Sequence, residues 1–333
     1  MKAYFEALDQ LRQTKKIPGL SVAILSDGHL QGAWGFGVAN VETAVPAGPD
    51  TPYNIASVTK PLSAVYILQL VEQGILNLDR PMVEYSPWAD FCQAFAEQPS
   101  IFSKDLVCLP AVHSLRHLLS HTATGLPGSR FSYNPVLYSW ASRPVMVVSG
   151  TTFSQGFTDA ILKPLNMNRS ARQFRDLALP PALAADLAPP HRMDENGNMV
   201  LAPPLQPQGD GAAGGIVTTV LDLATFDQAL DSDRLLKPET KAILFQRFQN
   251  HKGEVQDYAL GWYSETYRGM ELCWHSGWWE DAYSALYLKI PAKNLTLILL
   301  ANSEGLWWDN PLDKAEVHKS EFAMLFFQHF LKN

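Results

Sequence analysis

Apolar and polar positions alternate in a regular way at the N-terminal end of the chain. The first 16 residues place apolar side chains at i, i+4 and i+7 spacing, which predicts an amphipathic helix. Residues 20–25 and 30–38 follow as two candidate strands, and Asp27-Gly28 between them is a strong β-hairpin signal. The pattern therefore predicts a helix followed by two paired strands.

The C-terminal end shows similar elements in the opposite order. Residues 271–275, 283–290 and 295–301 are predicted strands, with a turn over 291–294, and residues 314–331 are a predicted amphipathic helix. A helix and two strands at one end, and three strands and a helix at the other, combine most economically in one antiparallel sheet. We expect the terminal helices to cover one face of that sheet.

The middle of the chain has a mostly helical pattern. Residues 57–73 are apolar nearly all round, which predicts a buried helix, and Gly74 supplies its C-cap. Residues 179–207 are rich in proline and are predicted to form an excursion over the surface. Shorter helices are predicted at residues 115–120, 151–162 and 218–230.

Together these elements predict an α+β fold with two domains. Residues 1–50 and 209–333 would form an α/β domain around the antiparallel sheet flanked by the terminal helices, and residues 51–208 a mostly α inserted domain. Since ligand sites occur preferentially at domain interfaces, we expect the active site in the cleft between the two.

The composition excludes several classes of protein. Hydrophobic residues make up 47% of the 333 residues, enough for a sizeable core, so the chain is not mainly disordered. The 26 basic and 33 acidic residues give a formal net charge of -7, which argues against a nucleic-acid partner because such proteins need a basic face. No apolar stretch approaches the roughly 18 residues of a membrane-spanning helix.

The N-terminal segment also bears on where the protein works. It lacks the unbroken apolar region and the small-residue cleavage site of a signal peptide. We therefore expect a cytoplasmic protein from the chain as given, or a periplasmic or secreted protein if a leader was removed.

The chain has three cysteines, Cys92, Cys108 and Cys273. They are far apart in the sequence and form no C-x-x-C pair, so we expect neither a disulfide framework nor a thiolate zinc site. The three side chains are predicted to be small buried apolar groups.

Ser57 and Lys60 form an S-x-x-K pair where the predicted buried helix begins. Residues at i and i+3 share one helix face, so the hydroxyl and the amine should lie close together. A serine hydroxyl needs a base, and a lysine can serve when desolvation lowers its pKa toward neutrality. The helix N-terminus adds a partial positive charge and an N–H group that suit a developing oxyanion. No G-x-S-x-G elbow offers another nucleophile.

Further short segments accompany this pair along almost the whole chain. They are residues 18–23, 54–61, 116–122, 125–127, 164–167, 213–219, 222–224, 275–277 and 301–303. In these segments the chain resembles the serine β-lactamase and penicillin-binding-protein superfamily, in the branch of class C β-lactamases, D-Ala-D-Ala peptidases and family VIII esterases. The resemblance implies a β-lactamase/transpeptidase-like fold.

The second motif of that family, usually Tyr-x-Asn, is altered here. Aligned on the tyrosine, Tyr133 matches but Pro135 replaces the asparagine; aligned on the asparagine, residues 132–134 give the S-x-N form of other branches. We favour the first alignment because Tyr138 then falls at the family's downstream tyrosine. The missing amide, and His275 in place of the third-motif lysine, resemble family VIII esterases or peptidases with H-x-G more than efficient β-lactamases.

The resemblance implies an acyl-enzyme mechanism that uses neither a cofactor nor a metal. Ser57 would attack the substrate carbonyl, while Lys60 and Tyr133 would remove its proton and pass it to the leaving group. The backbone N–H groups of Ser57 and Trp278 would form the oxyanion hole. His275 would sit beside Tyr133, bias its proton and, when protonated, meet a substrate carboxylate.

The expected partner is a small-molecule ester, amide or β-lactam. The expected function is a serine hydrolase, with carboxylesterase ahead of β-lactamase or D-amino-acid peptidase. The predicted substrate contacts are Asn134, Ser276, Gly277 and Trp279.

Two alternatives remain open at this stage. The incomplete second motif is compatible with a covalent sensor that is acylated by a β-lactam but does not turn it over. A metal-dependent hydrolase would instead use a row of histidines at i, i+4 and i+8 spacing, although most such rows are structural. That row is His113, His117 and His121.

Overall fold

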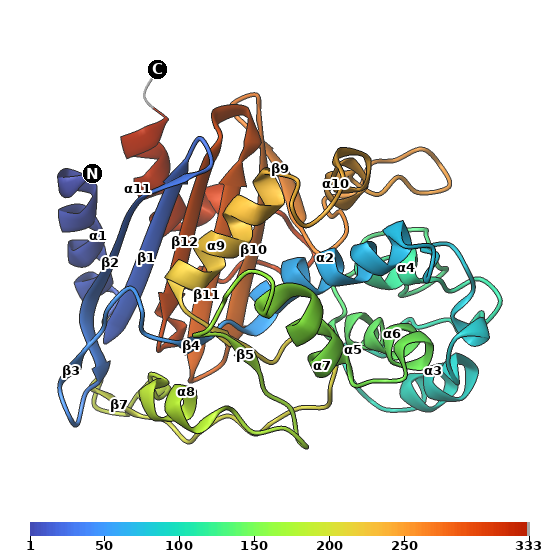
Figure 1. Ribbon diagram of the computed structural model, residues 1–333, viewed down its shortest axis with the longest axis horizontal. Coiled ribbons are helices and arrows are strands. Elements are labelled where there is room, and N and C mark those ends of the chain that lie inside the picture. Colours follow the sequence, from blue (N-terminus) through green and yellow to red (C-terminus); the bar gives the residue numbers. More distant parts are fainter. Residues whose placement is uncertain (332–333) are drawn as a thin grey trace.

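The computed structural model describes residues 1–331 and is built around a seven-stranded antiparallel sheet (Figure 1). The strand order is β3-β2-β1-β12-β11-β10-β9, so strands from the two ends of the chain lie side by side. The strands are β1 (Gly19–Ser26), β2 (His29–Asn40), β3 (Val45–Pro46), β9 (Tyr263–Tyr267), β10 (Met270–Trp279), β11 (Tyr283–Ile290) and β12 (Leu295–Ala301).

β1 and β12 join the two ends of the chain at the middle of the sheet. Their antiparallel register pairs Leu20 with Ala301 and Ser26 with Leu295. Both strands are buried along nearly their whole length, because helices cover both faces of the sheet. This explains why their sequences are nearly continuous apolar runs rather than alternating ones.

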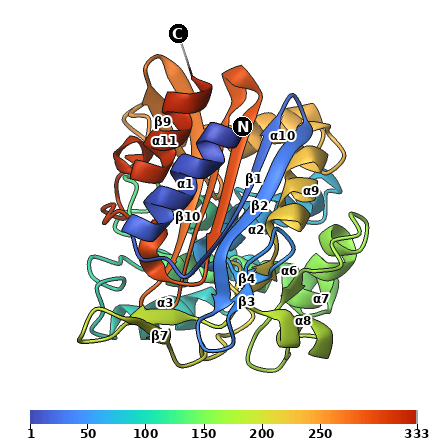
Figure 2. The ribbon, with the colours of Figure 1, turned by 90° about the vertical axis from the view of Figure 1, so that its left-hand side faces the viewer.

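The terminal helices α1 (Lys2–Thr14) and α11 (Glu321–Phe330) lie side by side on one face of the sheet (Figure 2). Tyr4 of α1 packs edge-on against Phe326 and Phe330 of α11. The opposite face is covered by α9 (Val220–Asp231), which contacts β1 and β12. Successive residues of a strand point to opposite faces, so β1 contributes to the core on both sides.

Most other helices lie between β4 (Tyr53–Asn54) and β8 (Ile216–Thr218) in the sequence. β8 pairs with both β4 and β5 (Ala171–Arg172) in a small second sheet. β6 (His191–Met193) and β7 (Met199–Leu201) form a separate hairpin. Within residues 1–331, none of the helices has both the length and the hydrophobicity needed to cross a membrane. The helices between β4 and β8 in the sequence are α2 (Thr59–Glu72), α3 (Trp88–Ala96), α4 (Leu115–Leu119), α5 (Pro135–Ser139), α6 (Ser142–Ser149), α7 (Phe153–Phe157) and α8 (Pro181–Asp186). One more helix, α10 (Pro238–Phe245), follows α9.

The α+β fold class and the sheet built from both ends are as the sequence predicts. Several details differ, and three of them follow. β9 was not predicted, because three of its five residues are polar. The last helix begins at Glu321 rather than at residue 314, since Ser320 Oγ accepts a hydrogen bond from the Ala323 N–H and caps the helix there. The proline-rich stretch 179–207 holds α8 and the β6–β7 hairpin.

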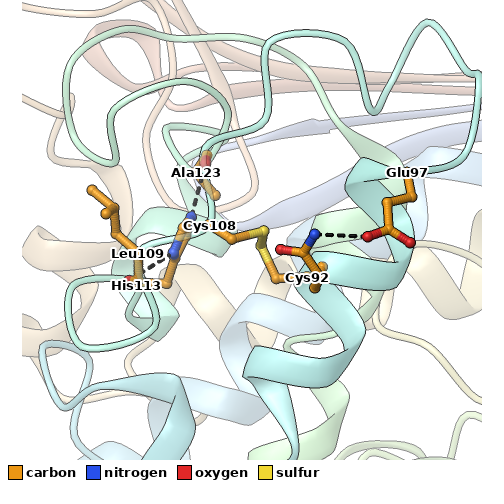
Figure 3. Close-up of a disulfide and its surroundings, with 7 residues drawn as sticks. Cys92, Glu97, Cys108, Leu109, His113 and Ala123 are labelled. Carbon is orange, nitrogen blue, oxygen red and sulfur yellow. Dashed lines mark hydrogen bonds between the residues drawn. A yellow bond between two sulfur atoms is a disulfide. The ribbon is translucent and has the colours of Figure 1, made fainter.

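The expectation for the cysteines was wrong for two of the three. Cys92 of α3 and Cys108 form a disulfide with their Cα atoms 5.8 Å apart, and only Cys273 is free and buried (Figure 3). The segment between them folds back over α3, and sequence spacing carries no information about such a return. Next to the disulfide, the ring nitrogens of His113 bond the carbonyl oxygens of Leu109 and Ala123 (Figure 3).

Candidate active site

Ser57 lies in a 3₁₀ turn, Ala56–Val58, that leads directly into α2. The preceding residue, Ala56, has a left-handed φ of 47°, a conformation that residues with a side chain rarely adopt. The Ala56 N–H donates a hydrogen bond of 2.9 Å to Asn54 Oδ1, which holds the turn. The turn places the partly exposed Ser57 on the surface of a cavity, at the start of a buried helix.

Lys60 follows one helical turn after Ser57 and is fully buried. Its Nζ atom lies 2.7 Å from Ser57 Oγ, 2.7 Å from Tyr133 Oη and 3.3 Å from the Ala213 carbonyl oxygen. Burial holds the pKa of Lys60 well below its ordinary value, and within residues 1–331 no carboxylate opposes this effect. Burial therefore favours the uncharged amine, which has a lone pair available.

Tyr133 completes a triangle of polar atoms with Ser57 and Lys60. Its Oη atom lies 3.0 Å from Ser57 Oγ, and burial raises the pKa of the phenol above its ordinary value. The ring is stacked on Tyr263, and the backbone N–H donates to Asp313 Oδ1 at 2.6 Å. Tyr133 is thus held in place from several sides and stays a neutral phenol at neutral pH.

The triangle defines what the three groups can do chemically. A neutral amine can accept the Ser57 proton, and a neutral phenol can accept one proton while it donates another. No ion pair has to be broken before the first proton moves. The arrangement therefore suits nucleophilic attack by Ser57 with Lys60 as base and Tyr133 as proton relay.

β10 borders the cavity on the side of the Ser57 turn. A Cβ atom at Gly277 would lie 2.2 Å from the Ile55 carbonyl oxygen, so only glycine allows the strand to approach this turn so closely. The pairing of β10 with β9 stops at Trp274. Residues 275–279 therefore border the cavity without a strand on that side, and Ser276 lines it.

Trp278 and Trp279 lie at the end of β10 and both line the cavity. The Trp278 indole N–H donates to Glu304 Oε2 at 3.1 Å, and its ring is stacked on Trp307. The Trp279 indole N–H donates to Asn54 Oδ1 at 3.2 Å, the same atom that holds the turn before Ser57. The two indoles are thereby fixed as walls of the cavity.

His275 also lines the cavity, but its contacts differ from those expected. Its Nδ1 lies 2.6 Å from the Ser276 carbonyl oxygen and therefore carries the proton, so Nε2 accepts a 2.9 Å hydrogen bond from Tyr258 Oη. Burial, followed by the nearby Lys60, holds the pKa of His275 well below its ordinary value. The ring is neutral and has no hydrogen bond to Tyr133; the two ring centroids are 6.1 Å apart.

Asn134 lies next to Tyr133 but turns its amide away from the cavity. Its Oδ1 atom accepts from the Leu137 N–H and caps α5, while Nδ2 donates to the Phe102 carbonyl oxygen at 2.6 Å. The side chain is 2% exposed and does not line the cavity. The expectation that Asn134 contacts substrate is therefore corrected, since both ends of its amide have structural partners.

The cavity in front of Ser57 has a volume of about 630 Å³. Its lining comes from the helical middle of the chain and from the C-terminal part, and it is rich in aromatic rings. Arg143 and Glu280 are the only lining residues with side chains charged at neutral pH. The aromatic lining residues are Phe102, Tyr133, Trp140, Tyr263, Trp278, Trp279 and Trp307.

Three features of the site were not predicted from the sequence. The Ala213 carbonyl accepts from Lys60, Tyr258 binds His275, and His121 packs against Tyr133 with ring centroids 4.3 Å apart. From the sequence, Ala213 is predicted only as part of a family segment, and His121 only as part of a family segment and of the histidine row. Asn134 followed by Pro135 is itself a helix N-cap signal and could have revealed the capping role of Asn134.

The histidine row does not converge on one point. His113 bonds two carbonyl oxygens, His117 Nδ1 accepts from the Ser114 N–H at 3.2 Å, and His121 Nδ1 accepts from the Asn134 N–H at 3.0 Å. Among residues 1–331, no group of three or more histidine, cysteine, aspartate or glutamate side chains is placed to hold a metal ion.

Comparison with known proteins shows the family. The family model described as Beta-lactamase matches residues 5–320, so the chain belongs to the beta-lactamase family of serine hydrolases. Among curated relatives, Protein flp of Staphylococcus aureus (strain MW2) is 26% identical over an alignment of 317 positions, which covers 87% of this chain and 60% of flp. The chain thus spans less than two thirds of the length of that relative.

Solved structures show the same fold. The octameric penicillin-binding protein homologue from Pyrococcus abyssi superimposes with a TM-score of 0.77 at 24% identity, covering 98% of this chain and 77% of the homologue. A class C beta lactamase from Rhodobacter sphaeroides gives a TM-score of 0.75 at 16% identity and covers both chains fully, at 100% each. At these identities the likeness extends to the fold alone.

Proposed function

We propose that this protein is a serine hydrolase that cleaves small uncharged esters through an acyl-enzyme, with Ser57 as nucleophile. The observation that carries the proposal is the triangle of Ser57 Oγ, Lys60 Nζ and Tyr133 Oη, with separations of 2.7, 2.7 and 3.0 Å. Burial supplies the uncharged amine that a serine nucleophile requires.

Acylation begins when the Lys60 amine takes the Ser57 proton, directly or through Tyr133. The Ser57 Oγ–carbon bond forms, and the carbonyl oxygen becomes an oxyanion that meets the backbone N–H groups of Ser57 and Trp278. The bond from carbon to the leaving oxygen then breaks. The leaving oxygen takes the Tyr133 proton, and Tyr133 regains one from the Lys60 ammonium.

Deacylation reverses the roles of the same groups. A water molecule loses a proton to Lys60, directly or through Tyr133, and attacks the acyl carbon. The Ser57 Oγ–carbon bond breaks, and Ser57 regains its proton, which releases the carboxylic acid. Because the base is uncharged at the start of each half-reaction, no metal or cofactor is needed to activate either nucleophile.

The lining of the cavity supports an uncharged substrate. The candidate third-motif residue, His275, is neutral, and both its ring nitrogens are already bonded, so it offers no cation to a substrate carboxylate. Arg143 and Glu280, the two charged residues of the lining, have opposite signs, so together they give the lining no net positive charge for a carboxylate. The aromatic walls suit a bulky apolar acyl or alcohol group. We therefore place esters ahead of β-lactams and peptides that carry a terminal carboxylate.

One observation favours a second candidate, a covalent β-lactam sensor without turnover. The Asn134 amide is committed to capping α5, so the site lacks a side-chain amide beside Tyr133. Such a site would acylate and then deacylate slowly.

A substrate panel with a Ser57→Ala control tests the proposal. We expect turnover of chromogenic short-chain esters, little turnover of nitrocefin, and loss of both with Ser57→Ala. Intact-mass measurement after β-lactam treatment separates the sensor, which would give a stable adduct without turnover. Ester hydrolysis that is undiminished in Ser57→Ala would overturn both.

A further inference from the structure

His121 holds the backbone on both sides of Tyr133. Its carbonyl oxygen accepts a 2.8 Å hydrogen bond from the Ser132 N–H, and its ring Nδ1 accepts a 3.0 Å bond from the Asn134 N–H. The imidazole lies against the Tyr133 ring, with centroids 4.3 Å apart. One residue thus fixes both neighbours of Tyr133 and one face of its ring.

We infer that His121 is the positioning residue of Tyr133, which keeps the phenol oxygen within reach of both Ser57 Oγ and Lys60 Nζ. This inference rests on the proposed function and extends it to a residue that does not itself touch the reacting atoms.

The protonation of His121 follows from its contacts. Since Nδ1 accepts a backbone hydrogen bond, the proton of the neutral ring is on Nε2, a fully buried atom without a hydrogen-bond partner among residues 1–331. The aromatic rings that pack around the imidazole are Phe131, Tyr133, Tyr138 and Tyr258. Burial, then the nearby Lys60 and His275, hold the pKa of His121 well below its ordinary value. The ring therefore packs beside the Lys60 amine without adding a competing positive charge.

The backbone of His121 shows that this placement is built in. Its φ is 53°, in the left-handed region that residues with a side chain rarely adopt. The neighbouring row member His117 makes a capping contact within its own helix instead, through Nδ1 to the Ser114 N–H. The strained conformation turns residue 121 out of the helix and lets the ring and the carbonyl face residues 132–134.

Two substitutions of His121 distinguish a positioning role of its side chain from a simple loss of side-chain volume. His121→Ala removes the bond to Asn134 and the ring contact. His121→Asn retains a δ-oxygen that can accept from the Asn134 N–H, and asparagine tolerates a left-handed φ well. A misplacement of about 1 Å at a reacting group can cost roughly 100-fold in rate. We expect kcat for a short-chain ester to fall roughly 10- to 100-fold in His121→Ala with KM little changed, and His121→Asn to recover most of the loss.

A double-mutant cycle with Tyr133→Phe shows whether the effect of His121→Ala on kcat requires the Tyr133 hydroxyl. If His121 acts by positioning Tyr133 Oη, His121→Ala should lower kcat less than about twofold in the Tyr133→Phe background. His117→Gln is the matched control for loss of a histidine from the same helix. It should lower the unfolding temperature while kcat stays near the wild-type value.

The outcomes distinguish the inference from the proposed function. The rate of Ser57 labelling by a fluorophosphonate, followed by intact mass, serves as a readout that does not need turnover. If neither hydrolysis nor labelling depends on Ser57, both ideas fail. If both depend on Ser57 but are unchanged in His121→Ala, or fall equally with and without the Tyr133 hydroxyl, only the positioning role is overturned.

Discussion

Asp313 accepts a 2.6 Å hydrogen bond from the backbone N–H of Tyr133, although the two residues are 180 positions apart in the sequence. The neighbouring Leu312 carbonyl accepts from Tyr263 Oη at 2.7 Å, and Tyr263 is stacked on Tyr133. The segment before α11 therefore also supports the position of the phenol. The placement of Tyr133 depends on a C-terminal segment that is far from it in the sequence.

The first prediction concerns this contact. Asp313→Ala removes a hydrogen bond to a charged acceptor, worth about 1.5–3 kcal/mol, and releases the Tyr133 backbone. We expect kcat for the ester substrate to fall by roughly tenfold or more. Asp313→Asn is the control, because its amide oxygen can still accept the bond. Equal activity of the two variants would show that the acceptor does not position Tyr133.

A second prediction follows from the buried amine. The pKa of Lys60 is lowered in the folded protein, whereas the unfolded chain keeps the ordinary value of 10.5. Between these two values the unfolded state binds more protons, so the free energy of unfolding rises with pH across that window. Lys60→Met removes this proton-linked cost. The variant should be more stable than wild type at pH 7, and the difference should shrink as the pH approaches 10.5.

Chemical denaturation at several pH values between 7 and 10 measures the effect. Ser57→Ala is the control, since it keeps Lys60 and its stability should follow the wild-type pH dependence. The same Lys60→Met variant should lose roughly 10²- to 10⁴-fold in ester acylation, the usual contribution of a general base. A stability difference that does not vary with pH would mean that Lys60 is not buried as an uncharged amine.

The contact between Ser57 and Lys60 could be predicted because the turn that holds Ser57 leads directly into the helix that holds Lys60, so the i, i+3 spacing brings the two side chains together. The central strands could be predicted because burial on both faces makes them continuous apolar runs. Tyr133 was assigned from the resemblance, since nothing in the local pattern brings it to Ser57.

The remaining features depend on contacts between distant segments. His275 is hydrogen-bonded to Tyr258 rather than to Tyr133, and Cys92 forms a disulfide with Cys108. Both contacts depend on the paths of loops, which the local pattern of apolar and polar residues does not determine. Asn134 was misread for a different reason. An asparagine beside a candidate catalytic tyrosine suggested chemistry, while the following proline indicated a helix cap.

A third prediction tests the close approach of β10 to the Ser57 turn. In Gly277→Ala the new Cβ would lie 2.2 Å from the Ile55 carbonyl oxygen, so the strand or the turn must move. We expect a loss of about 1–3 kcal/mol in stability from overpacking, and a fall in kcat of roughly 100-fold because the turn carries Ser57. Steady-state kinetics and thermal unfolding measure the two effects.

Gly209→Ala is a suitable comparison for that variant. No other atom lies within 4 Å of the position where its Cβ would stand. Its stability should remain within about 0.5 kcal/mol of wild type. If Gly277→Ala is equally stable and active, a Cβ atom at residue 277 is tolerated. The close approach of β10 would then not be what positions the turn that carries Ser57.

The disulfide gives a fourth prediction, which concerns both stability and substrate binding. Cys92 and Cys108 enclose Phe102, which lines the cavity and whose carbonyl oxygen accepts from Asn134. A crosslink that closes a loop of about 15 residues stabilises a protein by about 3 kcal/mol. We expect a reductant, or the double substitution Cys92→Ala with Cys108→Ala, to lower the unfolding temperature and to raise KM more than it lowers kcat.

The free Cys273 provides the control, because its thiol is buried and burial raises its pKa to about 12, so reductants and thiol reagents should not affect it. Adding reductant to the double variant should cause no further change. Since structural disulfides persist in oxidising compartments, we propose that the protein works outside the cytoplasm. Thiol labelling of the native protein from its source cells tests this: labelling of Cys92 and Cys108 without prior reduction would contradict both the crosslink and the location.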